Sequence, residues 1–291
     1  MDRAYMKGIH MKTTSTLLST IGSCLLLFSA AVSQQAHTDK VTVPLTDPSR
    51  PVFLKVGLLS GSITVNGYSG KDVIVEAVTH PEDDDEGDDD NAAKAKGLKL
   101  IPNSSTGLTV EEDNNTVDVS NSGRWGSRRV DLSIQVPVNC SMKLSTVNDG
   151  NIVVNGVKGE LDVNNTNEAV TLKDISGSVV AHALNGDIHV TMNAVNPDKP
   201  MSFSSLNGEI DVMFPSSIKA SVDIDNEQGQ VYSDFDMNLE KSKPVVEETT
   251  KKKGGKYKVT IDKGMKGTIN GGGQEIQFKN FNGNIYIRKG K

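Results

Sequence analysis

A nine-residue repeat of aliphatic residues constrains this chain more than any other feature of its sequence. Written in blocks of nine, the repeat begins at Gly150, Gly159, Glu168, Gly177 and Gly186. The third position holds Ile152, Leu161, Val170, Val179 and Ile188, and the fifth holds Val154, Val163, Leu172, Ala181 and Val190. The eighth position of the complete blocks holds Val157, Thr166, Ile175 and Leu184. These three positions are therefore predicted to point inward. The same three positions recur near the C-terminus at Ile276, Phe278 and Phe281, and the pattern continues with Ile285 and Ile287.

The repeat predicts short strands that are buried on one face. Positions three and five alternate as in a half-buried strand, and the Gly at position one suits a tight corner with a positive φ. Two kinds of corner alternate, so the full repeat has eighteen residues. A unit of this size cannot bury its apolar face alone, so units must stack. The sequence thus predicts an all-β fold, a β-solenoid: a single-stranded, β-helix-like stack of short strands with about 18–22 residues per coil.

One kind of corner carries asparagines, at Asn148, Asn167 and Asn185. Stacked asparagines hydrogen-bond one another and the local backbone, so we expect them to be structural. Asn-Gly pairs are also the strongest hairpin signal, which makes a sandwich of hairpins the rival fold. Hairpins do not require Asn and Gly at a fixed spacing, so the repeat favours stacked coils.

The region before the repeat has a looser pattern. Residues 34–140 contain alternating, strand-like runs at irregular spacing, which fit either early coils or an antiparallel cap on the stack. The predicted organisation is a signal peptide at 1–33, an irregular N-terminal β-strand region at 34–140 and the repeat β-solenoid at 141–291.

The first residues predict export. Lys7 and Lys12 precede an apolar run over 17–32, and a small-x-small motif fits cleavage after Ser33. A loose lipobox at Cys24 offers a lipoprotein as the alternative. No later segment is apolar enough to span a bilayer. The expected location is the periplasm or the cell surface.

Charge and cysteine content exclude several classes of partner and site. Removal of residues 1–33 leaves 28 basic and 36 acidic residues, a net charge of −8, which argues against binding to nucleic acid or anionic lipid. Only Cys140 then remains, so an intrachain disulfide and a cysteine-based metal site are excluded. We expect Cys140 to be a small core residue rather than a nucleophile. No cofactor motif is present, and no cofactor is predicted.

An acidic run at 82–90 is a weak candidate for calcium, which prefers carboxylate oxygens. Its candidate ligands are Asp83, Asp84, Asp85, Asp88, Asp89 and Asp90. The spacing fits no EF-hand, and a block of like charge is typical of a solvated loop. No metal site is therefore predicted with these residues.

Polar residues on the outward positions of one strand row form a candidate ligand-binding patch. With coils about 4.8 Å apart, one surface would hold Asp187, His189, Glu209 and Asp211, followed on the next coil by Gln230 and Tyr232. Carboxylates beside a His can bind a ligand or a divalent metal, or cleave a polysaccharide by acid–base chemistry. The competing interpretation is a solvated polar sheet face.

Several segments resemble one known family. They lie at 130–137, 148–154, 184–190, 269–273 and 281–288. These segments resemble the bacterial β-strand-repeat family DUF4097, described as a "putative adhesin", and the resemblance extends over residues 41–290. It implies an extracytoplasmic, β-solenoid-like domain and supplies no catalytic residues.

The expected function is that of an exported, non-enzymatic β-solenoid, a structural or adhesin-like binding module at the cell envelope. Its expected partner is a glycan, an envelope protein or a second copy of itself. One alternative is an envelope signalling or stress accessory protein. Another is a glycan-active enzyme that uses the patch of Asp187, His189, Glu209 and Asp211.

Overall fold

The computed structural model describes residues 37–80, 107–121, 129–240, 245–247, 258–260 and 264–291. Their fold is all-β: a 20-stranded mixed sheet, a separate two-stranded sheet and no helix among the described residues. Gln35–Lys291 form a single unit. In the part of the chain that the structure describes, no helix has the length and apolarity needed to cross a membrane.

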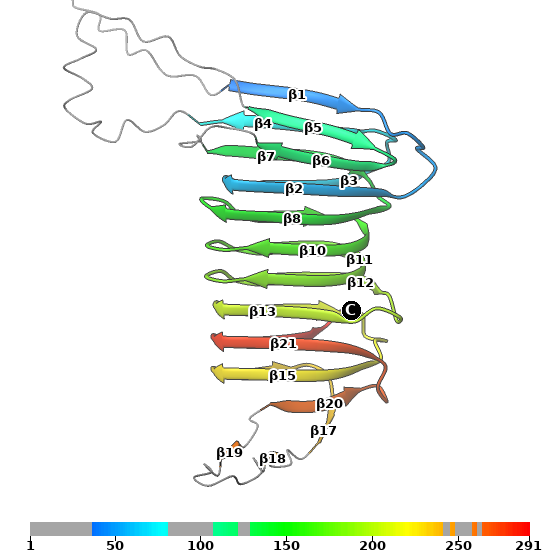
Figure 1. Cartoon of the computed structure of the whole chain (residues 1–291). Helices are drawn as coiled ribbons and strands as arrows, with labels where there is room; N and C mark the ends of the chain where they lie inside the picture. The colour runs from blue at the N-terminus through cyan, green and yellow to red at the C-terminus, as the bar shows by residue number, and fades with distance from the viewer. Residues whose placement is uncertain (1–36, 81–106, 122–128, 241–244, 248–257, 261–263) are drawn as a thin grey trace, which may run out of the picture. The chain divides into compact units, whose positions relative to one another are not determined.

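Most strands of the large sheet fall into two rows of parallel strands. The front row runs, in spatial order, through β6 (Thr116–Asn121), β2 (Val52–Ser60), β8 (Cys140–Asn148), β10 (Lys158–Asn165), the second half of β11 (Val170–Ala183), β13 (Met201–Asn207), β21 (Gln274–Asn282) and β15 (Ala220–Gln228). Most of these strands are visible one below another in Figure 1.

The back row runs through β7 (Val130–Pro137), β3 (Ile63–Tyr68), β9 (Ile152–Asn155), the first part of β11, β12 (Ile188–Val195), β14 (Ile210–Phe214), β22 (Ile285–Lys289) and β16 (Val231–Ser233). We call a front-row strand and the back-row strand that follows it a coil. Because β11 contributes to both rows, the two rows belong to one sheet.

Antiparallel strands cover parts of both ends of the stack. At one end, β4 (Val73–Thr79) pairs with β7 and with β1 (His37–Val43), and β5 (Leu108–Asp113) pairs with β6. At the other end, β20 (Met265–Ile269) pairs with β15 and with β17 (Met237–Leu239). A separate hairpin joins β18 (Val245–Glu247) and β19 (Lys258–Thr260). An open edge would otherwise present unpaired backbone groups to another chain.

The core consists of the inward residues at the third and fifth positions of the repeat. Val170 pairs with Ile152 on one side and with Ile188 on the other, so these three residues form the single interior row that the repeat predicted. All three have no exposed surface. Burial of such side chains contributes on the order of 1.5–3 kcal/mol each, and neighbouring coils share it.

The prediction for the eighth position was right at only one kind of corner. Val157 and Ile175 are buried, but Thr166 and Leu184 are only half-buried. Strand alternation continues through the front row, so the inward residues there are Asn165 and its in-register counterparts on other coils.

That third interior position carries a buried polar column. Thr146, Asn165, Ser205 and Asn280 each donate a side-chain hydrogen bond of 2.9–3.1 Å to a corner carbonyl of the preceding coil in the stack, on Gly61, Gly150, Gly186 and Gly208 respectively. These bonds satisfy carbonyl groups that would otherwise be buried without a partner. The column therefore ties each of these coils to its neighbour.

The corners pack closely, and the expected asparagine contacts are confirmed. Asn167 donates to the Oδ1 of Asn148 at 2.7 Å, and Asn185 donates to Asn167 at 3.1 Å. A Cβ on Gly208 would lie 2.3 Å from the carbonyl oxygen of Gly186. Gly208 has no positive φ, so at this corner glycine is required by the close approach of the next coil rather than by its own conformation.

The order of the coils in space differs from their order in sequence at both ends. The coil of β21 and β22 lies between the coil of β13 and β14 and the coil of β15 and β16. The coil of β2 and β3 likewise lies between the coil of β6 and β7 and the coil of β8 and β9. Each end of the chain thus supplies a coil that is enclosed on both sides.

Candidate functional site

The back row brings the predicted patch together. His189 pairs in register with Asp211, and Asp187 and Glu209 precede the same two strands. The Nε2 of His189 lies 4.0 Å from the Oδ2 of Asp187, and about half of each side chain is exposed. The four residues therefore share one surface, as the repeat predicted.

Three of the four side chains are already engaged by the protein. The Oδ1 of Asp187 accepts a 2.7 Å hydrogen bond from the backbone N–H of Glu209. Asn151 accepts in the same way from Ala169, and Asn284 from Gln230. A role that recurs at equivalent positions of three coils identifies Asp187 as a cap on the backbone of the next coil.

Asp211 is held by an arginine that lies far away in the sequence. The Nε of Arg288 donates to both carboxylate oxygens of Asp211, at 2.7 and 2.9 Å. This hydrogen bond raises the pKa of Arg288 further, so the guanidinium stays charged. Glu209 accepts a 3.3 Å hydrogen bond from Asn284. Asp187, Glu209 and Asp211 thus each join their own coil to the next coil of the stack.

Sequence reasoning missed the residues that the C-terminal coil adds to this surface. It expected Gln230 and Tyr232 directly after Glu209 and Asp211, but β22 lies between β14 and β16 and places Tyr286 there. The repeat did identify Ile285 and Ile287 as inward residues, and both are buried. The repeat predicts whether a side chain points inward or outward, but it does not predict which coil lies next to the one that carries the side chain.

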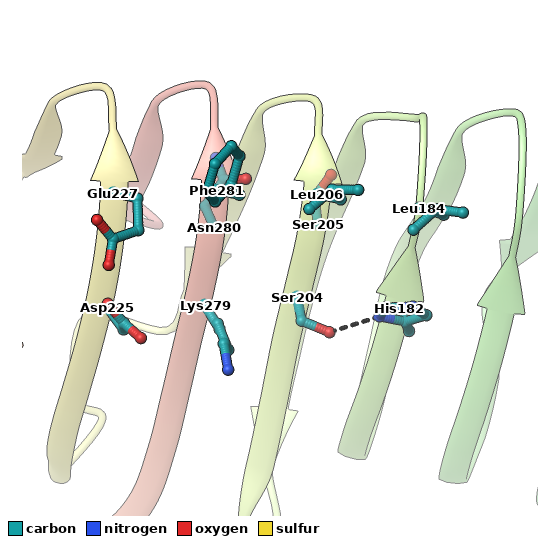
Figure 2. Close-up of a pocket in the computed structure, with 10 residues that line it drawn as sticks. All are labelled: His182, Leu184, Ser204, Ser205, Leu206, Asp225, Glu227, Lys279, Asn280 and Phe281. Atoms are coloured by element: carbon teal, nitrogen blue, oxygen red, sulfur yellow. Dashed lines mark hydrogen bonds between the residues drawn. The ribbon is translucent and has the colours of Figure 1, made fainter.

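A second candidate surface is a groove on the front row with a volume of about 500 Å³. Figure 2 shows Leu184, Leu206 and Phe281 near the ends of consecutive strands, with a line of polar side chains beside them. Within that line, His182 bonds to Ser204 at 2.7 Å. Lys279 and Asp225 follow on the next two strands in register.

The groove forms part of a longer apolar ridge. The apolar ridge consists of Leu59, Val147, Leu184, Leu206 and Phe281, one from each of five coils. Leu206 is 40% exposed and Phe281 is 46% exposed. The repeat predicted that Leu184 and Phe281 point inward, which was wrong, because strand alternation buries the residue before each of them, Ala183 and Asn280, and turns these two side chains outward. Thr166, directly after β10, interrupts the ridge between Val147 and Leu184. The run of Leu184, Leu206 and Phe281 at the ends of consecutive strands is an apolar surface of the kind that marks interaction sites.

The remaining nucleophilic and charged candidates are structural. Cys140 is completely buried, and burial raises the pKa of its thiol to about 12. A buried, protonated thiol is neither a nucleophile nor a metal ligand at neutral pH. This confirms the prediction that Cys140 is a small core residue.

A polar cluster links two coils near the N-terminal end. Asp131 accepts hydrogen bonds of 2.8 Å from both the backbone N–H and the hydroxyl of Ser62, and one of 2.6 Å from His80. Burial alone would raise the pKa of Asp131, but the hydrogen bonds from Ser62, Arg129 and His80 outweigh it and lower that pKa. The cluster joins β7 to the corner that precedes β3.

The acidic run at 82–90, with its candidate calcium ligands, lies outside the described residues, as do residues 1–33 and Cys24. Among the residues that are described, no group of three or more His, Cys, Asp or Glu side chains could hold a metal ion.

Comparison with known proteins gives a family and distant structural likenesses. The family model described as "Toastrack DUF4097" matches residues 27–270. None of the curated proteins matches the chain. The match ends before β21 and β22, the strands that carry Phe281, Tyr286 and Arg288.

Solved structures are similar only at low identity. A "putative cell adhesion protein" from Clostridium sporogenes is 12% identical, with 88% of this chain and 100% of that chain covered and a TM-score of 0.44. A "putative adhesin" from Bacteroides fragilis is 14% identical, with 88% and 98% covered and a TM-score of 0.34. No TM-score here reaches 0.5, so these likenesses assign nothing to this chain.

Proposed function

The chain belongs to the toastrack DUF4097 family, and from this premise we propose that it is an exported, non-enzymatic β-solenoid that acts as an adhesin-like binding module at the cell envelope. The in-register parallel pairing along both rows supports the β-solenoid. In such a fold the outward side chains form long columns, and a column offers a repetitive surface rather than a convergent pocket.

The observation that carries the binding role is the apolar ridge with its groove. Leu206 and Phe281 are exposed side by side on neighbouring strands. The side chains of Lys279 and Asp225 lie beside them and form no hydrogen bond or ion pair with another described residue. An exposed apolar strip next to uncommitted charged groups is suited to a partner that brings both apolar contact and hydrogen bonds.

The state of the carboxylate patch supports a role other than catalysis. General acid–base chemistry needs a carboxyl group that is free to exchange a proton with a substrate. Asp211 is bonded through both oxygens to Arg288, and Asp187 is bonded to a backbone N–H. Asp211 cannot act on a substrate without first releasing Arg288, which joins two coils.

A binding experiment with a matched control tests the groove. Purified protein is applied to arrayed envelope polysaccharides and, in parallel, used to capture proteins from envelope extracts. The double variant Leu206→Ala with Phe281→Ala should lose most of the binding. The control Leu239→Ala, which removes a 59% exposed leucine on β17 outside the groove, should keep it. Equal binding by all three proteins would reject the groove as the binding surface.

The location is tested separately by cell fractionation. Export predicts that the chain is recovered from the periplasm or the envelope and that it lacks residues 1–33. Recovery of the full-length chain from the cytoplasm would contradict export. Capture of one membrane regulator, with no binding to any polysaccharide, would instead support the signalling alternative.

A further inference from the structure

The last strand of the back row presents an aromatic ring at the end of the stack. Tyr232 on β16 is 52% exposed and lies in register with Tyr286 on β22. The two rings are stacked, with centroids 5.2 Å apart and an angle of 10° between their planes. One face of Tyr232 is therefore covered by Tyr286, and the opposite face points along the stack, away from β22.

That second face has no strand against it in the described part of the chain. There, β16 pairs with β22 alone, and no described strand pairs with its other edge. The back row thus ends one strand before the front row, whose last parallel strand, β15, is covered by β20. Tyr232 is left as an open aromatic surface at this step.

The protein fixes this ring in place through a chain of contacts across three coils. Tyr286 packs against Tyr232, and the guanidinium carbon of Arg288 lies 5.1 Å from the centre of the Tyr286 ring. Arg288 is in turn held by both oxygens of Asp211. Asn284 donates a 3.0 Å hydrogen bond to the hydroxyl oxygen of Tyr286. A rigid, pre-organised ring loses little conformational entropy when a ligand binds.

Polar groups flank the ring on its own segment. Gln230 and Asp234 lie two residues before and after Tyr232, and both are exposed. Asp234 uses one carboxylate oxygen to accept a 3.3 Å hydrogen bond from the backbone of Lys289. Its other oxygen and the amide of Gln230 offer acceptors and donors of the kind that hydroxyl groups need.

From this arrangement we infer that the open face of Tyr232 is a binding site for a neutral sugar ring. A pyranose has an apolar face of C–H groups that packs on an aromatic ring, and hydroxyl groups around its rim that would reach Gln230 and Asp234. The charge of Arg288 is matched by Asp211, and Asp234, two residues after Tyr232, places a negative charge beside the ring. Anionic sugars and phosphates are therefore disfavoured. Asp211 and Arg288 are positioning residues, because they hold the ring of Tyr286 on which Tyr232 is stacked.

This inference concerns a different surface from the groove of Figure 2, and it stands or falls independently of that groove. The test uses the purified protein with two neutral probes, the linear β-1,4-linked hexasaccharides of glucose and of N-acetylglucosamine. Saturation-transfer NMR and titration report binding. The unaltered protein should bind at least one probe, and Tyr232→Ala should weaken that binding about tenfold or more.

Matched variants separate stacking from folding. Tyr232→Phe keeps the ring and should bind like the unaltered protein. Arg288→Ala should weaken binding less than Tyr232→Ala does, because it only loosens the ring of Tyr286 that supports Tyr232. Phe281→Ala, in the groove, should leave binding to the probes unchanged. Unaltered circular dichroism of Tyr232→Ala would show that a loss of binding is local.

Three results would overturn the inference. The first is the absence of binding to both probes at millimolar concentration, and the second is undiminished binding by Tyr232→Ala. The third is a concentration-dependent dimer in analytical ultracentrifugation that Tyr232→Ala abolishes, because the open face would then belong to a second copy of the chain.

Discussion

Between Cys140 and Val195 the coils stack in the order in which the chain makes them, whereas at both ends the first or last coil in sequence is inserted between two coils that follow one another along the chain. The middle is therefore held by contacts between residues about one repeat apart, such as Val170 with Ile152 and Ile188. At the C-terminal end, Ile210 pairs with Ile285, 75 positions away.

The difference shows that the same kind of coil can be added to the stack in sequence order or inserted between two coils that have already been made. In the middle, sequential stacking is a local process, since each coil can pack as soon as its neighbour has formed. At the ends, an inserted coil must close a long loop, which costs conformational entropy and slows folding. In return, the coils of β2/β3 and β21/β22 are enclosed on both sides, and the patch on the back row receives Tyr286 and Arg288 from β22. Three predictions test this contrast.

Removal of the inserted C-terminal coil should have the largest effect. Deletion of residues 274–291 takes away Ile276, Phe278, Ile285 and Ile287, all buried. Burial of these four side chains contributes about 6 to 12 kcal/mol to the free energy of folding. Its loss is comparable to the whole stability of a typical domain. Hydrogen exchange should show lost protection over 201–239 and retained protection over 140–195. Equal loss across both regions would show that the middle does not fold as a local unit.

Replacement of a corner glycine by alanine should lower stability by the same amount in the middle as at the boundary of an inserted coil. A Cβ at Gly186, in the middle, would lie 2.1 Å from the carbonyl oxygen of Glu168, and one at Gly150 would lie 2.3 Å from that of Gly61 on the inserted N-terminal coil. Each glycine-to-alanine change should lower the free energy of unfolding by about 1–3 kcal/mol, measured by urea denaturation. Gly57→Ala, whose Cβ would meet only the hydroxyl of Ser145 at 3.5 Å, is the control and should change stability little. A large loss at only one corner would break the equivalence of the two regions.

The smallest effect is a pH dependence at the N-terminal inserted coil. The pKa of Asp131 is lowered in the folded state, so its contribution to stability is present above its unfolded pKa near 3.8 and is lost as the pH falls further. Asp131→Asn should therefore cost about 1–2 kcal/mol at pH 7 and less at pH 3, below the unfolded pKa, measured by denaturation at both values.

The matched control for Asp131 is Asp162→Asn. Asp162 is half-exposed and pairs with Lys143 at 3.0 Å on the surface of the middle coils, where an ion pair contributes little. A pH-independent difference between Asp131→Asn and the unaltered protein would mean that the Ser62 contact acts through shape alone.

Much of the architecture could be predicted because it is local. The alternation of Ile152 with Val154 fixes which residues face inward, and the eighteen-residue spacing fixes the register of neighbouring coils. The errors have the same origin. Leu184 and Phe281 were placed inside because the eighth position was assumed to face inward at both kinds of corner, whereas strand alternation in the front row turns these two side chains outward. The patch of Asp187, His189, Glu209 and Asp211 was located correctly, but the partners that engage it were missed.

The sequence by itself determined that this chain is all-β, which side chains form its interior rows, and that asparagines and glycines occupy its corners. Only the tertiary structure decided which coils are neighbours. The physical reason is that every coil presents nearly the same aliphatic face, so Ile210 could pack equally well against Val231 or Ile285. Chain connectivity and the antiparallel strands at the two ends determine that Ile285 is the neighbour. This order places Arg288 against Asp211 and leaves Tyr232 on the last strand of the back row.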